Sequence, residues 1–403
     1  MDNNYFANHA TKLILALPLT ILLIGVSSKA LPRQLFATIR HDDHTLNSSS
    51  SSPCNFPAVF NFGDSNSDTG GWSATFGQAE PPHGETFFHA PAGRYSDGRL
   101  LIDFIAEGVG IPYLNAYLDS MGSNFSHGAN FATAAATIRP QNSTSFSPFS
   151  LNVQVYQFHD FRQRLQIICN RGDVFKSLMP KAEYFSEALY TFDIGQNDLT
   201  SVYFPDMSID RVKEKIPDIL NQFKAYVKEV YIREGRYFWI HNTGPLGCLT
   251  YMLNGQTLNA TQMDQTGCAI SLNEVAQDFN SGLKKIVAQL RQEMPLAAIT
   301  YVDIYSIKYD LISHAKKFGF ENPFLACCGH GGKNNYDMQK RCGSKIMENG
   351  KEVLVGSCKD PLVRISWDGA HYTEAANKWV FDRMVDGSYS DPPISLKMAC
   401  YKH

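Results

Sequence analysis

The chain has 403 residues, of which 44% are hydrophobic and 19% are charged. This composition excludes a disordered protein, because the apolar side chains suffice for a large buried core. Lysine and arginine number 36 against 39 aspartates and glutamates, a formal net charge of −3, which gives no electrostatic basis for binding nucleic acid or an anionic membrane. We therefore expect small neutral molecules as partners.

The first predicted segment is a signal peptide over residues 1–30. Lys12 precedes an apolar run from Leu13 to Val26, and small residues follow at positions typical of a cleavage site. A membrane anchor is the alternative, but the run is shorter than the roughly 20 residues that span a bilayer, and Pro18 interrupts it. We expect a secreted, extracellular protein, with the cell wall or vacuole as other destinations, and no stable membrane insertion.

The segment that follows is polar and rich in serine toward its end. It predicts a flexible leader over residues 31–53, before a single domain over residues 54–403. No internal repeat or second linker of low complexity interrupts that domain.

Cysteines and sequons agree with a secretory route. Nine cysteines follow the signal, and an oxidising compartment makes disulfides their expected state. Because the count is odd, at least one cysteine stays unpaired or pairs with another chain. The sequons predict glycosylation at Asn47, Asn124, Asn142 and Asn259.

Strand-length apolar runs alternate with amphipathic helical runs along the domain. Strands are predicted over residues 58–62, 128–132, 188–194, 236–241 and 298–304. Helices are predicted over residues 100–110, 210–235, 271–293 and 373–385, with Pro217 either kinking the second helix or lying in its first turn. This alternation predicts an α/β fold with a mostly parallel sheet covered on both faces, whose C-terminal strand ends share one edge.

The stretch FNFGDSNSDTGG, Phe60 to Gly71, places a serine in turn chemistry where the first predicted strand ends. Ligands bind at the C-terminal edge of open α/β sheets, so Ser65 is either a nucleophile presented to a ligand at this edge or an ordinary turn serine. The chain contains no G-x-S-x-G, which excludes the nucleophile elbow of α/β-hydrolases.

The stretch WDGAH sets Asp368 three residues before His371 at the entrance of the last predicted helix. An imidazole that acts as general base needs a carboxylate on Nδ1, and one short loop supplies both residue types at this spacing. The alternative is that Asp368 caps a turn and His371 is an ordinary polar residue. Only the combination with Ser65 favours a catalytic relay.

Four motifs carry a resemblance to a known family: FNFGDSNSDTGG, GANFATAAATI, DIGQND and WDGAH, in this order. From about Cys54 to its C-terminus, the chain resembles the plant GDSL esterases/lipases of the SGNH hydrolase superfamily, and most resembles their early-nodulin-like branch, which contains acetylesterases. The resemblance implies a three-layer, flavodoxin-like α/β fold and a mostly parallel central sheet. It also implies a small ester substrate, such as an acylated sugar, metabolite or lipid, and no cofactor.

By this resemblance, Ser65 is the nucleophile, His371 the general base and acid, and Asp368 the carboxylate that orients it. The implied oxyanion hole combines the backbone N–H of Ser65, a backbone N–H from the second motif and the side chain of Asn197.

The donor from the second motif needs separate treatment, because the family usually has glycine where this chain has Ala135. An alanine keeps the backbone donor without strain if its φ is negative, but not if the loop requires a positive φ. We expect Ala135 to donate, with Gly128, which opens the same segment, as the fallback.

Two further groups have plainer interpretations. CCGHGG, together with Cys342 and Cys358, raises the alternative of a zinc site, but no C-x-x-C pair is present and secretion favours disulfides, so we expect no metal. Asp64 and Asp198 adjoin the nucleophile and the oxyanion asparagine, and we expect both to hold their loops through hydrogen bonds to the backbone.

The resemblance thus implies a secreted serine carboxylic-ester hydrolase acting on acetyl or other short acyl esters, or on longer lipid esters, through an acyl-enzyme. An acyltransferase is one alternative, since an alcohol in place of water would accept the acyl group from the same triad. A non-catalytic secreted glycoprotein is another, although a binding protein does not need a nucleophile beside its base.

Overall fold

The sheet forms from the apolar runs of the sequence, each of which is followed by turn residues. The computed structural model describes residues 52–140, 147–200, 208–255 and 258–402; the predicted signal peptide, Asn47 and Asn142 lie outside them. The strands are β1 (Val59–Gly63), β2 (Gly128–Asn130), β3 (Leu189–Asp193), β4 (Tyr237–His241), β5 (Ala298–Val302) and β8 (Ser390–Asp391) in the main sheet, and β6 (Lys345–Glu348) and β7 (Lys351–Leu354) in a separate hairpin.

The main sheet has the strand order β2-β1-β3-β4-β5-β8. The strands from β1 to β5 pair in parallel, and only β8 runs antiparallel, beside β5. The order 2-1-3-4-5 is that of flavodoxin-like sheets, in which a crevice opens at the C-terminal end of the first strand because the chain changes direction there. The predicted α/β class and mostly parallel sheet are confirmed, and Ser65 follows directly at that crevice.

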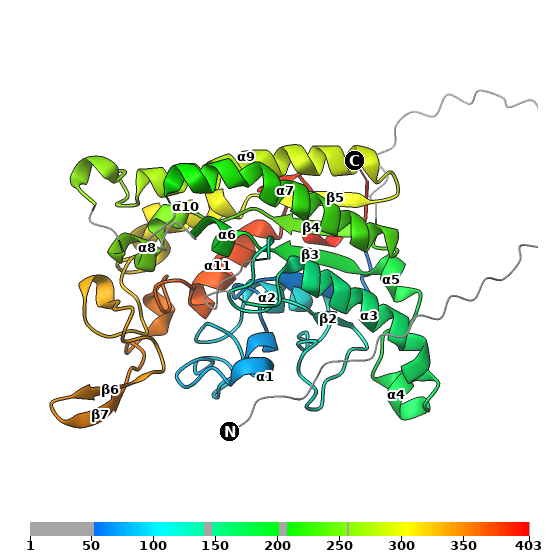
Figure 1. Ribbon diagram of the computed structural model, residues 1–403, viewed down its shortest axis with the longest axis horizontal. Helices are drawn as coiled ribbons and strands as arrows, with labels where there is room; N and C mark the ends of the chain where they lie inside the picture. Colours follow the sequence, from blue (N-terminus) through cyan, green and yellow to red (C-terminus); the bar gives the residue numbers. More distant parts are fainter. Residues whose placement is uncertain (1–51, 141–146, 201–207, 256–257, 403) are drawn as a thin grey trace, which may run out of the picture. The chain divides into compact units, whose positions relative to one another are not determined.

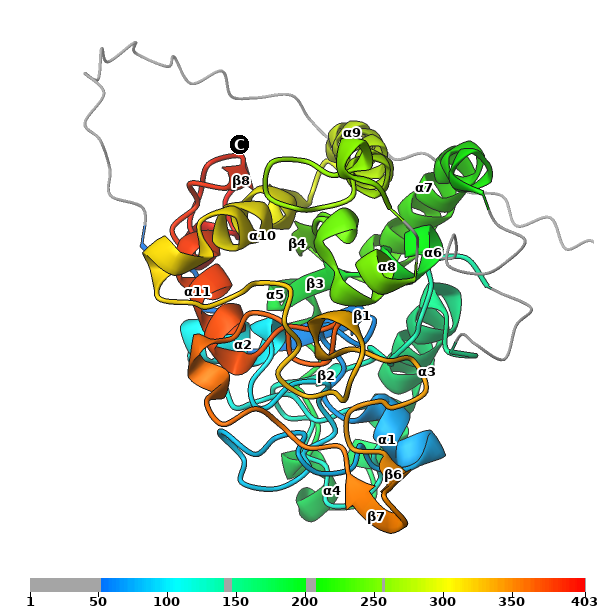
Figure 2. The same cartoon turned by 90° about the vertical axis from the view of Figure 1, so that its left-hand side faces the viewer.

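Helices cover both faces of this sheet. They are α1 (Gly71–Phe76), α2 (Leu101–Val109), α3 (Leu151–Cys169), α4 (Asp173–Ser177), α5 (Tyr184–Glu187), α6 (Gln196–Leu199), α7 (Ile209–Ile232), α8 (Thr250–Asn254), α9 (Ile270–Glu293), α10 (Ile304–Ser313) and α11 (Glu374–Met384). Short 3₁₀ turns are Leu246–Cys248, Ala260–Gln262, Ala315–Phe318, Lys333–Asn335, Pro361–Val363 and Leu396–Met398. Figures 1 and 2 show α3, α7 and α9 on one face and α2, α10 and α11 on the other.

The four predicted helices correspond to α2, α7, α9 and α11, whereas α3 and α10 were not predicted. Pro217 lies inside α7, so the alternative that it occupies the first turn of the helix is excluded.

Aromatic rings in the core fix the central strands relative to one another. Phe62 of β1 stacks on Phe192 of β3 at 4.9 Å between ring centroids and on Phe131, just beyond β2, at 5.4 Å. All three rings are buried. Because they lie at the ends of neighbouring strands, their packing holds the starting points of the loops that leave the sheet.

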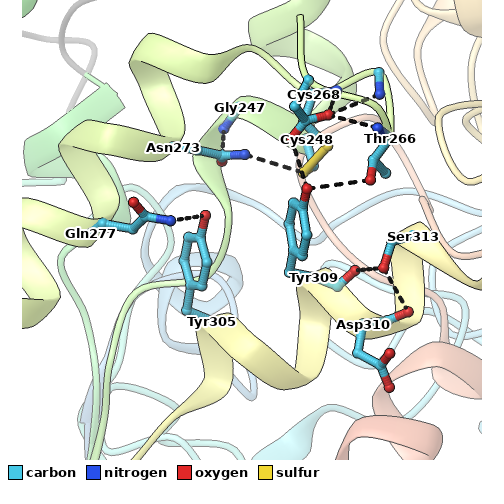
Figure 3. The surroundings of a disulfide bond; sticks show 12 residues. Gly247, Cys248, Thr266, Cys268, Asn273, Gln277, Tyr305, Tyr309, Asp310 and Ser313 are labelled. Carbon is cyan, nitrogen blue, oxygen red and sulfur yellow. Dashed lines mark hydrogen bonds between the residues drawn. A yellow bond between two sulfur atoms is a disulfide. The ribbon is translucent and has the colours of Figure 1, made fainter.

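Eight of the nine cysteines form disulfides, which confirms that prediction. The pairs are Cys54–Cys400, Cys248–Cys268, Cys327–Cys358 and Cys328–Cys342, and Cys169 is free. The cysteines of CCGHGG are thus disulfide-bonded. Figure 3 shows how the Cys248–Cys268 loop is anchored to α9, where Asn273 Oδ1 accepts the N–H of Gly247 at 2.9 Å.

Within the described ranges, no helix combines the length and the apolar character that crossing a membrane requires.

An ion pair is buried at the start of α2. Arg94 Nη2 and Nε donate to Asp103 Oδ1 and Oδ2 at 2.6 and 2.8 Å. Asp103 Oδ2 also accepts the N–H of Leu100 at 2.9 Å, so the same carboxylate caps the helix. Since the pair is bidentate and buried, each charge depends on the other for compensation.

Replacing this carboxylate is expected to destabilise the protein strongly. Asp103→Ala should lower the free energy of unfolding by about 3–5 kcal/mol, because the guanidinium of Arg94 then stays buried without its partner. Urea unfolding with the disulfides intact measures the change. The matched control Asp382→Ala removes the exposed pair of Lys378 and Asp382 and should have a much smaller effect; equal losses in the two variants would contradict this account.

Candidate active site

Ser65 lies on the loop that leaves β1 and is 6% exposed. Gly63, the last residue of β1, forms two hydrogen bonds with the side-chain amide of Gln154 on α3. Gln154 Oε1 accepts the N–H of Gly63 at 2.9 Å, and Gln154 Nε2 donates to the carbonyl of Gly63 at 2.8 Å. Asp64 Oδ1 then accepts the N–H of Asn66 at 2.9 Å, as predicted for a carboxylate that holds its own loop. These bonds fix the backbone on either side of the Ser65 hydroxyl.

The structure brings Ser65, His371 and Asp368 into one hydrogen-bonded relay. His371 Nε2 lies 2.7 Å from Ser65 Oγ, and His371 Nδ1 lies 2.6 Å from Asp368 Oδ2. Asp368 Oδ1 accepts the N–H groups of Ala370 and His371, both at 2.9 Å. The carboxylate therefore caps the turn with one oxygen and orients the imidazole with the other.

The charges of this pair reinforce each other. Burial opposes ionisation of both groups, but the His371 imidazolium and its hydrogen bond hold the pKa of Asp368 well below its usual range. Burial would likewise lower the pKa of His371, yet the Asp368 carboxylate outweighs it and raises that pKa above its ordinary value. The arrangement favours an imidazole that takes up a proton readily.

The second motif supplies a backbone donor at Ala135. Its φ is +58°, so this alanine adopts the left-handed conformation that glycine adopts more easily. Asp68 Oδ2 accepts the preceding N–H, that of Ala134, at 2.8 Å. The N–H groups of Ala135 and Ser65 donate to no acceptor among the described residues, which leaves both available to an oxyanion.

The motif DIGQND, which contains Asn197 and Asp198, is hydrogen-bonded to the motif GANFATAAATI, which contains Ala135. Asn197 Nδ2 donates to the carbonyl of Ala136 at 2.8 Å. An amide has two N–H groups, so this bond leaves one of them for a further acceptor. Asp198 accepts the N–H groups of Ile138 and Arg139 at 2.8 and 3.1 Å, which agrees with the loop-holding role predicted for it.

Gly128 is wrong as a fallback donor. It opens β2 and is paired in register with Val59 at the start of β1, and its N–H donates to the carbonyl of Phe125 at 3.0 Å. Since the strands are parallel, this glycine lies at the N-terminal end of the sheet, away from the edge that carries Ser65.

The loop that carries Asp368 and His371 is bonded to segments that contain disulfides. The N–H groups of Cys327 and Cys328 donate to the carbonyls of Ser366 and Trp367 at 3.0 and 2.6 Å, and that of Tyr251 donates to Gly369 at 3.1 Å. Both cysteines are themselves disulfide-bonded. The loop that carries His371 is thus supported by covalently cross-linked chain.

Two aromatic neighbours of this loop were missed by sequence reasoning. The ring of Tyr95 lies 5.4 Å from that of His371, and the ring of His83 lies 5.9 Å from that of Trp367. Burial lowers the pKa of His83, so it adds little positive charge beside the relay. Both residues fall in the segment PPHGETFFHAPAGRYSDGR, where no local pattern indicates contact with a motif so distant in sequence.

A hollow of about 700 Å³ has none of Ser65, Asp368 and His371 in its lining. It lies between α8 and the segment 332–338, and Leu253, Leu258, Met263, Lys333 and Tyr336 are among its lining residues. The ring of Tyr336 packs on Gly369: a Cβ at that position would lie 2.5 Å from Tyr336 Cδ2. Only glycine therefore fits at position 369, between the ring of Tyr336 and the turn that carries Asp368 and His371.

The remaining site predictions concern glycosylation and metal binding. Asn124 and Asn259 are exposed, as a glycosylation site requires. Throughout the part of the chain that the structure covers, no group of three or more His, Cys, Asp or Glu side chains is arranged to hold a metal ion.

Comparison with known proteins agrees with the motifs. The model of the GDSL-like Lipase/Acylhydrolase family matches residues 59–384. A GDSL esterase/lipase of Arabidopsis thaliana is 60% identical and aligns with 86% of this chain and 93% of its own length. Alpha-L-fucosidase 3 of the same plant is 55% identical over 83% and 91%, and GDSL esterase/lipase ENOD8 of Medicago truncatula is 50% identical over 87% and 91%.

The relay predicts how the reactivity of Ser65 depends on pH. Labelling of Ser65 by a fluorophosphonate should slow as the pH falls through a midpoint above the ordinary histidine value of about 6.5, because His371 must be neutral to accept the proton. Asp368→Asn removes the charge that raises this pKa, so the midpoint should move to lower pH and the rate should fall by up to about 10⁴-fold. Ser65→Ala controls for labelling elsewhere. An unchanged midpoint in Asp368→Asn would contradict the relay.

The backbone strain at Ala135 predicts a stabilising substitution. Ala135→Gly should raise the free energy of unfolding by about 0.5–1 kcal/mol, because the left-handed conformation costs alanine more than the added chain entropy costs glycine. Thermal unfolding measures the change, and Ala134→Gly is the neighbouring control, since no positive φ occurs at that position. A loss of stability at Ala135→Gly would show that no strain is relieved there.

Proposed function

Because this chain belongs to the GDSL-like lipase/acylhydrolase family and is a carboxylic-ester hydrolase, we propose that it is a secreted esterase whose triad is Ser65, His371 and Asp368. The observation that carries the proposal is the relay from Ser65 Oγ through both nitrogens of His371 to Asp368. The other steps of the proposal follow from the groups that surround this relay.

In acylation, Ser65 Oγ attacks the ester carbonyl while His371 Nε2 removes its proton. Asp368 stabilises the imidazolium that forms, because its carboxylate is already hydrogen-bonded to Nδ1. The imidazolium then returns the proton to the alcohol oxygen, and the alcohol leaves. Water repeats the sequence on the acyl-enzyme and releases the acid, so no step requires a cofactor.

The tetrahedral oxyanion is stabilised by the N–H groups of Ser65 and Ala135 and by the Asn197 side chain. Removing one donor of this kind typically costs about 2.7–4 kcal/mol of transition-state stabilisation. The loops are fixed before substrate binds, since Asp68 and Asp198 hold the second motif from both sides. Little reorganisation is then needed as charge develops.

We propose a short acyl group, such as acetyl, on a sugar or specialised metabolite. This proposal is supported by the 50% identity with GDSL esterase/lipase ENOD8, because the early-nodulin-like branch that the chain resembles contains acetylesterases.

Secretion is part of the same proposal. It is supported by the four disulfides, which form and persist in oxidising compartments, by the exposed sequon asparagines Asn124 and Asn259, and by the apolar segment near the N-terminus.

The name of one relative, alpha-L-fucosidase 3, makes glycoside hydrolysis a second candidate. That chemistry normally uses two carboxyl groups on either side of the scissile bond, whereas this site presents a serine and an imidazole with one carboxylate behind them. Acyl transfer to an alcohol uses the same triad and differs only in what attacks the acyl-enzyme.

The deciding experiment uses the full chain, expressed with its own N-terminal segment and purified from the medium. Hydrolysis of p-nitrophenyl esters from acetate to palmitate is measured, with p-nitrophenyl α-L-fucoside as a separate substrate. We expect turnover of the short esters, and a loss of about 10³-fold or more in Ser65→Ala, because the nucleophile is removed while binding stays intact.

Other outcomes distinguish the alternatives. Turnover of the fucoside that survives in Ser65→Ala would favour a glycosidase. Ester cleavage that accelerates with added alcohols and yields new esters would indicate acyl transfer. Equal ester turnover in Ser65→Ala and the natural chain would overturn the proposed triad.

A further inference from the structure

A group of buried titratable side chains lies beside the candidate active site and takes no part in the proposed chemistry. We call Asp64, Asp193, His241 and Lys308 the basal cluster. Asp64, His241 and Lys308 are at most 5% exposed, and Asp193 has a side chain that is 16% exposed. They come from the ends of β1, β3 and β4 and from α10, so the cluster joins separate elements at the edge of the sheet that carries Ser65.

The two carboxylates of the cluster are neighbours. The N–H of Asp64 donates to the carbonyl of Asp193 at 3.1 Å, and His241 Nδ1 lies 3.3 Å from Asp193 Oδ2. Asp64 Oδ2 and both ring nitrogens of His241 have no hydrogen-bond partner among the described residues. Asp193 therefore joins the other two residues, Asp64 through the backbone and His241 through its side chain.

Lys308 reaches this cluster from α10. Its Nζ lies 4.2 Å from the ring centroid of Tyr372, the residue after His371. A Cβ on Gly244 would lie 3.1 Å from Lys308 Cδ, so the backbone after β4 packs closely on the stem of the lysine.

A buried ammonium is unfavourable unless other charges compensate for it. Burial lowers the pKa of Lys308, and the carboxylates of Asp193 and Asp64 act against that shift. The face of the Tyr372 ring adds a cation–π contribution. Lys308 thus contacts the residue after His371, and nearby buried carboxylates compensate for its charge.

We propose that Lys308 is a positioning residue, which holds the histidine loop through its contact with the Tyr372 ring so that His371 meets Ser65 in reacting geometry. This inference rests on the proposed triad and goes beyond it, since Lys308 touches neither the substrate nor the reacting atoms. Its expected effect is on the step that Ser65 and His371 perform together.

The cluster also acts on the charge of His371. Asp368 and Asp64 raise the pKa of His371, whereas Lys308 lowers it; the remaining titratable neighbour is His83, which faces both Asp368 and His371. Burial, with the charge of Asp193, raises the pKa of Asp64 itself to about 7. Removing Lys308 should therefore raise the pKa of His371, provided that Asp64 keeps its charge.

The test compares Lys308→Met with Lys308→Arg, which keeps the charge, using p-nitrophenyl acetate across a range of pH. We expect Lys308→Met to lower kcat by about tenfold to a hundredfold with little change in KM, because misplacement of the reacting groups affects the chemical step. The acid limb of kcat/KM should move to higher pH. Lys308→Arg should restore much of kcat.

Asp64→Asn should shift the acid limb of kcat/KM in the opposite direction. Loss of this negative charge should move the acid limb to lower pH. Adding Lys308→Met to the Asp64→Asn variant should then move the acid limb of kcat/KM back to higher pH. In this background the Asp64 carboxylate, whose protonation could offset the effect of removing Lys308, is absent. A purely structural role for Lys308 predicts lower stability but no such paired shifts.

Each outcome decides the inference. Unchanged kcat and acid limb in a folded Lys308→Met protein would overturn it, while ester turnover in the natural chain keeps the proposed function. If Lys308→Met does not fold, Tyr372→Leu, which removes the ring that Lys308 contacts, decides: a lower kcat with little change in KM supports the inference, and an unchanged kcat overturns it. A natural chain without ester turnover would instead overturn the proposed function on which the inference rests.

Discussion

Both ring nitrogens of His371 have partners, and those partners come from opposite ends of the domain. Asp368 belongs to the same short turn, whereas Ser65 lies 306 positions earlier in the chain. The rest of the structure has to keep His371 Nε2 within hydrogen-bond distance of Ser65 Oγ. A parallel sheet meets it because the ends of its strands share an edge, and the packing of Phe62 on Phe192 and Phe131 fixes those ends.

The loops are fixed by a few side chains that each reach into a different loop. Asp68 of the first motif binds the second, and Asn197 and Asp198 of the third bind it from the opposite side. Such cross-links explain how Ala135 keeps a positive φ in place of glycine: the bonds on either side of it are numerous enough to outweigh a local cost of about 1–2 kcal/mol.

What sequence could predict follows from how local the signal is. The strands, Ser65 and the Asp368–His371 turn were predictable, since apolar runs and turn residues are read from neighbouring positions. Helix α3 was not predicted, although its buried Val155, Phe158 and Leu165 have helical spacing, because polar residues separate them. Contacts between distant segments, such as Gln154 with Gly63 or Lys308 with Tyr372, leave no mark on either segment, and the partner of each cysteine is hidden for the same reason.

The support of the histidine loop by Cys327 and Cys328 has a consequence for where the enzyme can work. Their N–H groups hold Ser366 and Trp367, and disulfides fix both cysteines to chain further along. While these thiols are reduced, as in the cytosol, the backbone that supports the histidine is tethered only by weak contacts and has more conformations to lose on folding. An oxidising environment thus completes the support of the candidate active site, and a reducing one removes it.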